Sequence, residues 1–511
     1  MPDTPSKRRL RAFRALTLAF PVLFFVLVES GLRLFDYGPN LDLFVRVDSP
    51  PAGEAYLTTN PDVALRYFSR VGRTPRPPWD AFLEDKPPNG YRVFVMGGST
   101  AAGWPYPNNV MFSRVLDRRL SDAFPDRRIE VVNVGIAAVN SFTLLDFVDE
   151  ILDYEPDAFL IYAGHNEFYG ALGAASVESL GNARWIVNTY LSLLDSRIVR
   201  LMRDMAAAVG EWRADARAEA DYERTHPTLM SRMIARSVPY GSGAYRAGET
   251  NFRENLDDIL DRIAAAGVPV LVSELVSNVR DMPPFVSVQT DEHPPAQAIF
   301  DQARALEGDG RYDEARAAYD RARDLDALRF RASGDFNGII REVASAHGVP
   351  VVPMEAYFEA ASPHGLIGAN LMLEHLHPNA DGHLLMADAF FESMREHGFI
   401  AGEWDATPIR PAAWYAENWP VTELDRALGR LRAMDLMAYW PFRPLSEPGT
   451  AFEDFQPASP AEALAYRVAK DELDYVQAHI DLGDLYAAAG DLERAAREYQ
   501  AIAAADPLGG R

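Results

Sequence analysis

Short apolar runs alternate with amphipathic stretches through the middle of the chain. The runs are rich in valine and isoleucine, as in strands buried on both faces of a parallel sheet, and they span 91–97, 129–135, 157–164, 268–275 and 349–354. Amphipathic stretches with helical periodicity lie between or after these runs, at about 109–123, 141–153, 251–266, 335–347 and 381–397. This alternation predicts a doubly wound α/β fold with a mainly parallel five-stranded sheet and flanking helices. Such sheets bind ligands beyond the carboxyl ends of their strands.

A cationic segment precedes a bulky apolar run at the N-terminus. Residues 7–14 read KRRLRAFR, and residues 15–28 carry no charge. Extended to Phe35, the run has 21 residues, about enough to cross a bilayer at roughly 1.5 Å per residue. Under the positive-inside rule we expect a basic cytoplasmic segment over 1–14, a single-pass transmembrane anchor over 15–35, and the remainder in the periplasm or at the cell exterior. A cleaved signal peptide and a buried core helix are the alternatives, although no small-x-small cleavage site follows the run.

The rest of the chain divides by composition. Proline and polar residues dominate 36–90, which predicts a stalk or irregular lead-in to a sheet domain at 91–400. Helices at 460–511 resemble a tetratricopeptide repeat at Leu482, Gly483, Tyr486, Gly490, Ala495, Tyr499 and Pro507. An insertion at about 296–327 resembles the same repeat at Gly310, Ala315 and Tyr319. We expect residues 401–459 to form a linker. Because one helix pair cannot bury its own apolar face, each copy packs on the main domain or docks a protein partner.

Composition narrows the functional classes. The formal net charge of −24 and the pI near 4.9 would repel a phosphate backbone, so we expect no nucleic-acid partner. The chain has no cysteine, which excludes disulfides, thiolate nucleophiles and thiolate metal ligands. Its hydrophobic fraction of 48% and charged fraction of 24% are ordinary for a globular protein.

Residues suited to acyl-transfer chemistry follow several predicted strands. Ser99 stands in the turn GGST after the first strand, where an exposed hydroxyl can act as a nucleophile; a phosphate-binding loop or a plain turn gives the same pattern. Gly135 and Asn166 follow the second and third strands and offer an oxyanion a backbone N–H and a side-chain amide, with turn and capping roles as alternatives. After the last strand, His377 supplies a base. Glu374, three residues earlier, or a backbone carbonyl would orient its ring.

These blocks, in this order, resemble the SGNH/GDSL hydrolase superfamily, which is named for a serine, a glycine, an asparagine and a histidine. They map to Ser99, Gly135, Asn166 and His377. The resemblance implies a flavodoxin-like fold and a serine that attacks an ester carbonyl without a cofactor. It also implies an oxyanion hole made by the N–H groups of Ser99 and Gly135 and the side chain of Asn166. His377 would be the base, with Glu374 as the acid before it.

The chain departs from the family pattern at three points. The nucleophile block reads GGST in place of GDS, the third block reads GHNE in place of G-x-N-D, and Glu374 replaces the usual aspartate. The resemblance covers 91–170 and 370–395 directly, and the residues between them as an α/β continuation with insertions.

A metal site is the alternative use of the histidine-rich block. Its donors would come from His364, Glu374, His375, His377 and His383. The HExxH pattern of zinc proteases is absent, and the block is better explained as a catalytic-base loop, so we expect no metal.

Aromatic residues flank the blocks, and sugar stacking, an acyl pocket and core packing are all open roles for Trp104, Tyr106, Phe168 and Tyr169. The expected function is serine-dependent hydrolysis, through an acyl-enzyme, of an extracytoplasmic O-acylated glycan or lipid-type ester. An acyltransferase on envelope glycans with the same triad is one alternative. The other is a non-catalytic, membrane-anchored scaffold that docks partners through the repeat-like helices.

Overall fold

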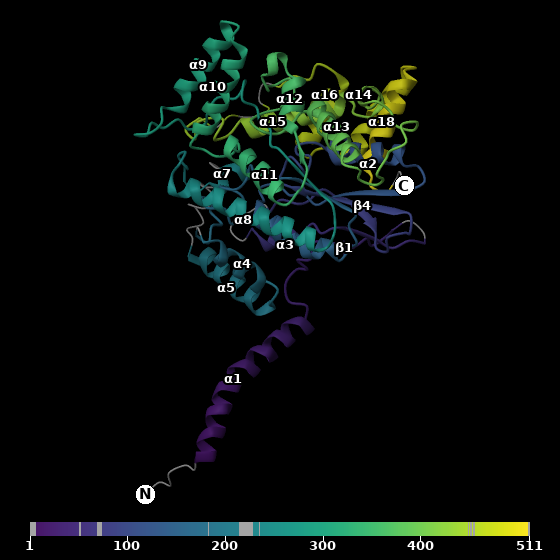
Figure 1. Cartoon of the computed structure of the whole chain (residues 1–511). Coiled ribbons are helices and arrows are strands. Elements are labelled where there is room, and N and C mark those ends of the chain that lie inside the picture. The colour runs from purple at the N-terminus through teal and green to yellow at the C-terminus, as the bar shows by residue number, and fades with distance from the viewer. Residues whose placement is uncertain are drawn as a thin grey trace.

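The computed structural model of the 511-residue chain describes residues 7–50, 53–68, 74–181, 183–213, 228–234, 236–447, 449, 452 and 455–508. Its body is built on a parallel sheet with helices on both faces, and a long N-terminal helix projects from that body (Figure 1).

Five parallel strands form the main sheet, in the order β5-β4-β6-β7-β8. They are β4 (Gly90–Gly97), β5 (Arg128–Asn133), β6 (Ala158–Tyr162), β7 (Val270–Ser273) and β8 (Val351–Val352). β4 is buried along its whole length between β5 and β6, with Val95 opposite Asn133 on one side and Leu160 on the other. The predicted doubly wound, parallel five-stranded sheet is confirmed.

Helices cover the two faces of the sheet in packed groups. α2 (Phe112–Ala123) packs against α13 (Ala380–Glu396). α3 (Ser141–Leu152) packs against α8 (Gly243–Ala265), which also contacts α11 (Gly334–Ala346). Periodicity predicts all five of these helices. Further helices of this part of the chain are η1 (Val63–Arg66), η2 (Asn108–Val110), α4 (Arg184–Leu193), α5 (Arg197–Arg213), α7 (Leu229–Met233), α12 (Met354–Ala360) and η3 (Pro363–Gly365).

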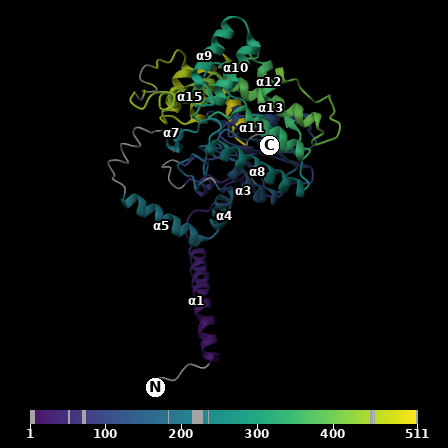
Figure 2. The ribbon, with the colours of Figure 1, turned by 60° about the vertical axis from the view of Figure 1, so that its left-hand side comes forward.

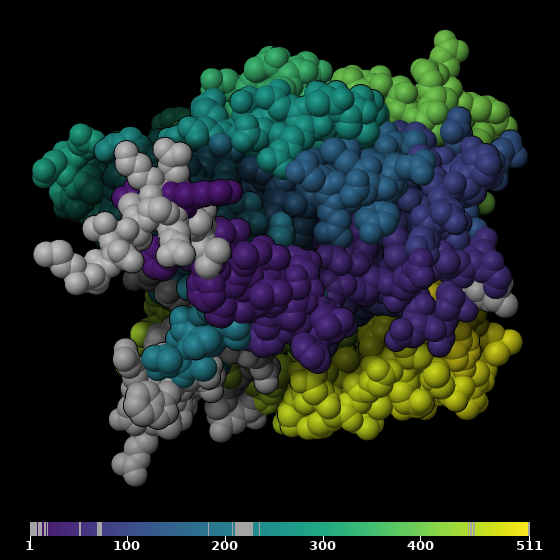
Figure 3. Space-filling view, turned by 90° about the horizontal axis from the view of Figure 1, so that it is seen from below, coloured from purple at the N-terminus to yellow at the C-terminus, as the bar shows by residue number. Residues whose placement is uncertain are grey.

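The predicted stalk over residues 36–90 is wrong, because most of this segment belongs to the body. β1 (Phe44–Arg46), β2 (Tyr56–Thr59) and β3 (Ala81–Leu83) form a small antiparallel sheet. Its apolar side chains, among them Phe44, Leu57 and Phe82, lie in the same hydrophobic core as the main sheet. Seen from below, the purple N-terminal part of the chain lies across this face of the body, beside the yellow C-terminal helices (Figure 3).

A buried ion pair fixes the lead-in to the main sheet. Arg92 of β4 and Glu130 of β5 are 2.8 Å apart, with side chains that are 1% and 0% exposed. Arg92 also donates to the carbonyl oxygen of Leu83 at 2.7 Å, and the N–H of Leu83 donates to Glu130 at 2.9 Å. Because buried charges need partners, the backbone N–H and carbonyl oxygen of Leu83 bond to the two charges and hold the end of β3 in place.

The predicted linker over 401–459 is also wrong for its described residues. This part contains α14 (Ala412–Asn418) and α15 (Glu423–Met437), the latter starting with a capping box between Thr422 and Asp425. Leucines of α15 form a second hydrophobic core with α16 (Pro460–Ala469) and α17 (Tyr475–Ala488). Positions 448, 450–451 and 453–454 lie outside the described residues.

Two helix pairs occur where repeat-like segments are predicted. α9 (Ala296–Gly308) and α10 (Tyr312–Leu325) form the first, and α17 and α18 (Leu492–Ala505) form the second. Their turns contain Gly310 and Gly490, whose φ angles of 75° and 80° favour glycine. Their identity as tetratricopeptide repeats stays a prediction, and residues 509–511 of the C-terminal segment lie outside the described residues.

The N-terminal helix α1 (Lys7–Leu34) projects away from the body in two views (Figures 1 and 2). Its C-terminal end is tied to α5, because the carboxylate of Glu29 accepts hydrogen bonds from the N–H groups of Arg197 and Ile198 at 3.1 and 3.0 Å. Within the described residues, no helix combines the length and apolar character needed to cross a membrane, so the anchor predicted over 15–35 is without structural support. Residues 1–6 of the predicted basic segment 1–14 lie outside the described residues.

A buried polar cluster joins the C-terminal helices to the sheet domain. His479 of α17 contacts Glu498 of α18 at 2.6 Å through Nδ1 and Asp425 of α15 at 3.4 Å through Nε2. Asp425 also accepts from Asn109 of η2 at 2.9 Å and from the Tyr475 hydroxyl at 2.8 Å. Burial opposes a charged ring, but hydrogen bonds and charges from Asp425 and Glu498 raise the pKa of His479 to about 9. His479 is therefore an imidazolium at neutral pH.

The charge on His479 makes the stability of this junction depend on pH. The folded-state pKa lies above the ordinary value of 6.5, so the stabilisation is complete below about pH 6.5 and is lost as the pH rises through 9. We expect the free energy of unfolding in urea to fall by about 3 kcal/mol over this interval. In His479→Gln that fall should disappear, whereas in the control His347→Gln, at a partly exposed histidine, it should remain. Equal pH profiles for the wild type and His479→Gln would contradict the assignment.

Candidate active site

The turn after β4 holds Ser99 at the carboxyl edge of the sheet. Two glycines precede it, and neither position has space for a side chain. A Cβ at Gly97 would lie 2.2 Å from the carbonyl oxygen of Tyr162, and one at Gly98 would lie 2.6 Å from Nδ2 of Asn166. The glycine pair therefore lets the nucleophile turn approach both β6 and the asparagine that follows it.

The structure brings Ser99 and His377 together. Nε2 of His377 lies 2.7 Å from Oγ of Ser99. On the other side of the ring, Nδ1 contacts Oε1 of Glu374, whose carboxylate also accepts from the N–H of His377 at 3.0 Å. With the Nδ1 proton directed at the carboxylate, Nε2 is free to accept the serine proton. The geometry is that of a Ser-His-Glu triad, with Glu374 rather than a backbone carbonyl as the orienting group.

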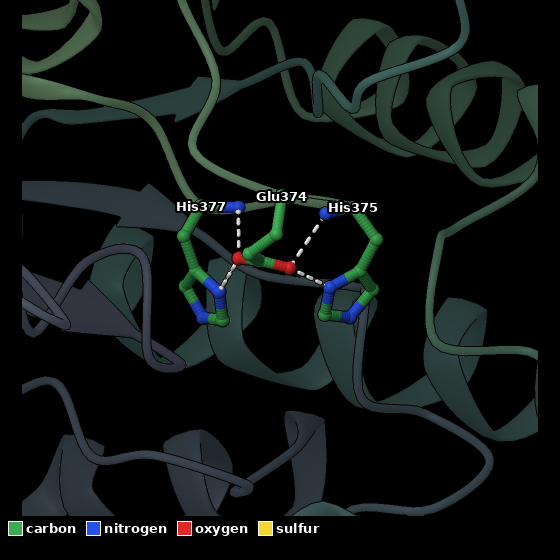
Figure 4. A group of neighbouring side chains, drawn as sticks. All are labelled: Glu374, His375 and His377. Atoms are coloured by element: carbon green, nitrogen blue, oxygen red, sulfur yellow. Dashed lines mark hydrogen bonds and ion pairs between the residues drawn. The ribbon is translucent and has the colours of Figure 1, made fainter. Parts of the chain in front are cut away.

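A second histidine shares the same carboxylate. Nδ1 of His375 contacts Oε2 of Glu374, and the N–H of His375 donates to that oxygen at 2.6 Å. Figure 4 shows Glu374 between the two imidazoles, with both rings on the same side of the loop. The His375 ring packs edge-on against Phe285, Phe330 and Phe442. Sequence patterns alone gave His375 no defined role, because its contact with Glu374 depends on the loop conformation.

Burial sets the protonation state of both rings. It lowers the pKa of His377 to about 3 and holds the pKa of His375 well below its ordinary value. The negative charge of Glu374 opposes this effect, but that charge is shared among four donors, two N–H groups and two rings. His377 is therefore neutral at pH 7 and able to act as a general base.

The oxyanion donors differ in part from those predicted. The prediction that Gly135 is an oxyanion donor is wrong, because its N–H already donates to Oδ1 of Asn133 at 2.9 Å. Ala138, three residues later, lines the cavity above Ser99 and has a φ of 58°. Among the described residues, no hydrogen bond engages the N–H of Ala138 or of Ser99. Asn166 donates to the carbonyl oxygen of Val139 at 3.0 Å and keeps a second N–H for a ligand.

Ala138 is a candidate oxyanion donor that sequence patterns did not reveal. Its left-handed backbone is rare for a side chain larger than hydrogen and directs the turn after β5. Ser99, Ala138 and Asn166 all line the cavity, so the N–H groups of Ser99 and Ala138 and the Asn166 amide are three candidate donors. This number of preorganised donors suits a tetrahedral oxyanion.

A cavity of about 430 Å³ opens over the triad. This volume falls in the range of small-molecule sites. Two of the four predicted aromatic residues line it, Trp104 and Tyr169, and the Trp104 ring centroid lies 4.4 Å from that of His377. The described residues of the lining are Ser99, Trp104, Ala137, Ala138, Asn166, Tyr169, Gly170, Thr228, Leu229, Met230, Arg232, Phe330, His375, Leu376, His377, Arg432, Asp435, Leu436 and Ala469.

The other two predicted substrate contacts are wrong, because both side chains lie in the protein interior. Phe168 is 2% exposed and stacks on Tyr245. Tyr106 lies beneath α15 against Gly429, and its hydroxyl accepts from the N–H of Ala380 at 3.1 Å. Proximity in sequence to a catalytic block does not decide which face of a loop a ring occupies.

The ligand atoms of Glu374, His375 and His377 lie within 4.8 Å of one another, close enough to hold a metal ion. Each is already used in a contact that serine catalysis requires or supports: both Nδ1 atoms meet the carboxylate, and Nε2 of His377 meets Ser99. The donor set is accounted for by a hydrogen-bonded triad.

A family model described as the GDSL-like lipase/acylhydrolase family matches residues 95–385, more than half of the chain. The chain belongs to this family. It is a hydrolase that acts on ester bonds. The match begins within β4, just before Ser99, and ends within α13, just after His377, so the triad lies inside it.

Several solved structures resemble this esterase. One is an acetyl xylan esterase, AlAXEase, with 13% identity and a TM-score of 0.31 over 59% of this chain and 98% of that chain. Another is Axe2, an acetylxylan esterase from Geobacillus stearothermophilus, with 12% identity and a TM-score of 0.30 over 60% of this chain and 94% of that chain. A GDSL-like lipase from Bacteroides thetaiotaomicron has 11% identity and a TM-score of 0.28 over 60% and 88%. No curated relative matches the sequence.

The Asn166 amide should act mainly in the transition state. We expect Asn166→Ala to lower kcat for p-nitrophenyl acetate by about 10²- to 10³-fold with little change in KM, because one oxyanion donor is lost. Asn166→Asp keeps the shape and should lose as much, since it offers no N–H. Asn418→Ala, at an exposed asparagine, is the control. A decrease in kcat for Asn166→Ala no larger than in the control would exclude Asn166 as a donor.

The shared carboxylate predicts a pH effect of His375. Removing its donor in His375→Phe leaves more of the Glu374 charge to His377, which stabilises the imidazolium and raises the pKa of His377. Because activity needs the neutral ring, the acid limb of the kcat/KM profile should move to higher pH. His375→Asn keeps a donor at the Nδ1 position and should leave the limb near that of the wild type. A shift to lower pH in His375→Phe, or equal shifts in both variants, would contradict a shared carboxylate.

Proposed function

We propose that this esterase hydrolyses an O-acylated glycan or a lipid-type ester through an acyl-enzyme. Ser99 attacks the acyl carbonyl while its proton passes to Nε2 of His377, and the oxyanion receives hydrogen bonds from Ser99, Ala138 and Asn166. His377 then gives the proton to the departing alcohol. Water then attacks the acyl-enzyme while His377 takes its proton. His377 returns that proton to Oγ of Ser99 as the carboxylic acid leaves.

The observation that carries the mechanism is the 2.7 Å contact between Ser99 and His377 at the floor of the cavity. A nucleophile and base at this distance, with the base oriented by Glu374 and three donors nearby, form the constellation that acyl transfer needs. Transfer of the acyl group to a sugar hydroxyl would use the same acyl-enzyme. We favour water as the acceptor because the family is one of hydrolases.

The lining of the cavity supports a glycan or lipid-type ester. Trp104 offers an aromatic surface for a sugar face or an acyl chain, and Leu229 and Met230 add an apolar wall; Tyr169, at 2% exposure, lies within the lining. A short acyl group fits beside such a wall, with the polar part of the substrate directed toward the charged residues of the cavity.

We also propose that the esterase acts outside the cytoplasm and is attached to a membrane through α1. Its support is a basic segment ahead of an apolar run, in which Phe20 and Val22 to Leu27 are all exposed. The helix pairs α9–α10 and α17–α18 are proposed sites for a protein partner.

The role of Ser99 can be tested directly with the full-length chain. Ser99→Ala should lower kcat/KM for short p-nitrophenyl esters by at least about 10³-fold, because the nucleophile is lost. A fluorophosphonate probe should label the wild type and not this variant. Ser345→Ala, at an exposed serine of α11, is the control for both measurements. Unchanged ester hydrolysis in a folded Ser99→Ala protein would overturn the proposed function.

A further inference from the structure

One wall of the catalytic cavity comes from outside the residues matched by the family model. The match ends at residue 385, whereas Arg432, Asp435 and Leu436 of α15 and Ala469 of α16 line the cavity with Ser99. The C-terminal helices therefore do more than pack on the sheet domain. They supply ionisable side chains to the space that a substrate would occupy.

Arg432 is held against the loop that carries the nucleophile. Its Nη1 donates to the carbonyl oxygen of Pro105 at 2.7 Å. Pro105 follows Trp104, whose ring lies 4.4 Å from that of His377. The guanidinium therefore bonds to the residue that follows Trp104, whose ring packs on the catalytic base, and it lines the same cavity.

Within the described part of the chain, no ion pair neutralises the charge of Arg432. Among the described residues, no carboxylate lies within ion-pair distance of it, whereas Arg426 and Arg430 of the same helix pair with Asp381 and Glu462. Burial lowers the pKa of Arg432, and Asp471, beyond ion-pair distance, opposes this only in part. An arginine nonetheless stays charged in a protein. A partly buried cation of this kind is stabilised by an anion that enters the cavity.

The other charged residues of the lining do not remove this preference. Asp435 lies one turn beyond Arg432, and among the described residues the two form no ion pair. Arg232 of α7 also lines the cavity, but it has an interaction of its own, so the preference for an anion depends on Arg432. His375 and His377 are neutral at pH 7, as argued above. Among the described residues of the lining, two are arginines and one is a carboxylate, in a chain whose net charge is −24.

We propose that Arg432 binds an anionic substituent of the ester substrate, a carboxylate or a phosphate, and so selects an acylated acidic sugar over its neutral counterpart. The inference rests on the proposed function and defines its substrate class. The guanidinium has five N–H donors and, within the part of the chain that the structure describes, one hydrogen bond, so donors are available for an anion. Both a uronic acid and a sugar phosphate carry such a group close to an acylated hydroxyl.

The experiment compares three acetylated methyl glycosides with the full-length esterase: those of glucose, glucuronic acid and glucose 6-phosphate. The readout is the ratio of kcat/KM for each anionic substrate to that for the neutral one. In the wild type at least one ratio should exceed about 10, since hydrogen bonds to charged groups contribute roughly 10- to 100-fold. The larger of the two ratios identifies carboxylate or phosphate as the preferred group.

Three variants isolate the charge of Arg432. Arg432→Gln keeps an N–H for the Pro105 carbonyl and should reduce the ratio to near 1, mainly through KM. Arg432→Lys keeps the charge without the planar donor set and should retain part of the ratio. Arg430→Gln removes the same charge from the same helix outside the cavity and should behave as the wild type. A ratio near 1 in the wild type, or an unchanged ratio in Arg432→Gln, would overturn the inference.

Binding separates this inference from the proposed chemistry. The Ser99→Ala variant cannot hydrolyse the substrates, so calorimetry can measure their binding alone. In this variant at least one anionic glycoside should bind more tightly than the neutral one. Adding Arg432→Gln to Ser99→Ala should abolish that difference in affinity. If the wild type hydrolyses no ester but the order of binding is as expected, the proposed function fails and the anion site stands. If hydrolysis occurs and the three ligands bind equally, the anion site fails and the proposed function stands.

Discussion

The buried carboxylate of Glu374 is the constraint on which the catalytic edge depends. Its side chain is fully enclosed, so the charge is tolerable only if donors surround it. Those donors are the N–H groups and Nδ1 atoms of His375 and His377, two positions of one short loop. Satisfying the carboxylate therefore also fixes both rings. It sets the tautomer of the base and leaves Nε2 of His377 directed at Ser99.

The parallel sheet brings the remaining parts of the site to this loop. Ser99, Ala138 and Asn166 follow β4, β5 and β6, which are neighbours in the order β5-β4-β6. Because parallel strands end at the same edge, three turns that are far apart in sequence meet around one cavity. The cap of α13 completes the arrangement, since Asn379 accepts from the N–H of Gly382 and starts the helix two residues after His377.

The sheet and the triad could be predicted from sequence because both depend on strong local signals. Strands buried on both faces read as continuous apolar runs, and Ser99, Glu374 and His377 stand in short blocks of recognisable chemistry. Gly135 failed as an oxyanion donor because the direction of an N–H depends on the whole turn, and the left-handed residue of that turn is the alanine at 138. The prediction of a stalk over residues 36–90 failed for a different reason. The strands of this segment have three or four residues, too few to show a period, and the end of β3 is bonded to the Arg92–Glu130 pair of other strands.

The C-terminal helices were separated from the site in sequence but not in space. α15 contains many charged residues and lies in the predicted linker, yet it lines the cavity above the triad. Its position is fixed by Asp425, which binds both Asn109, in the segment after Ser99, and Tyr475 of α17. The same helix thus meets the His479 cluster at one end and carries Arg432 toward its other end. Chemistry and selection are therefore placed on different units, with the triad on the sheet domain and the proposed anion-binding wall on a helix that lines the cavity.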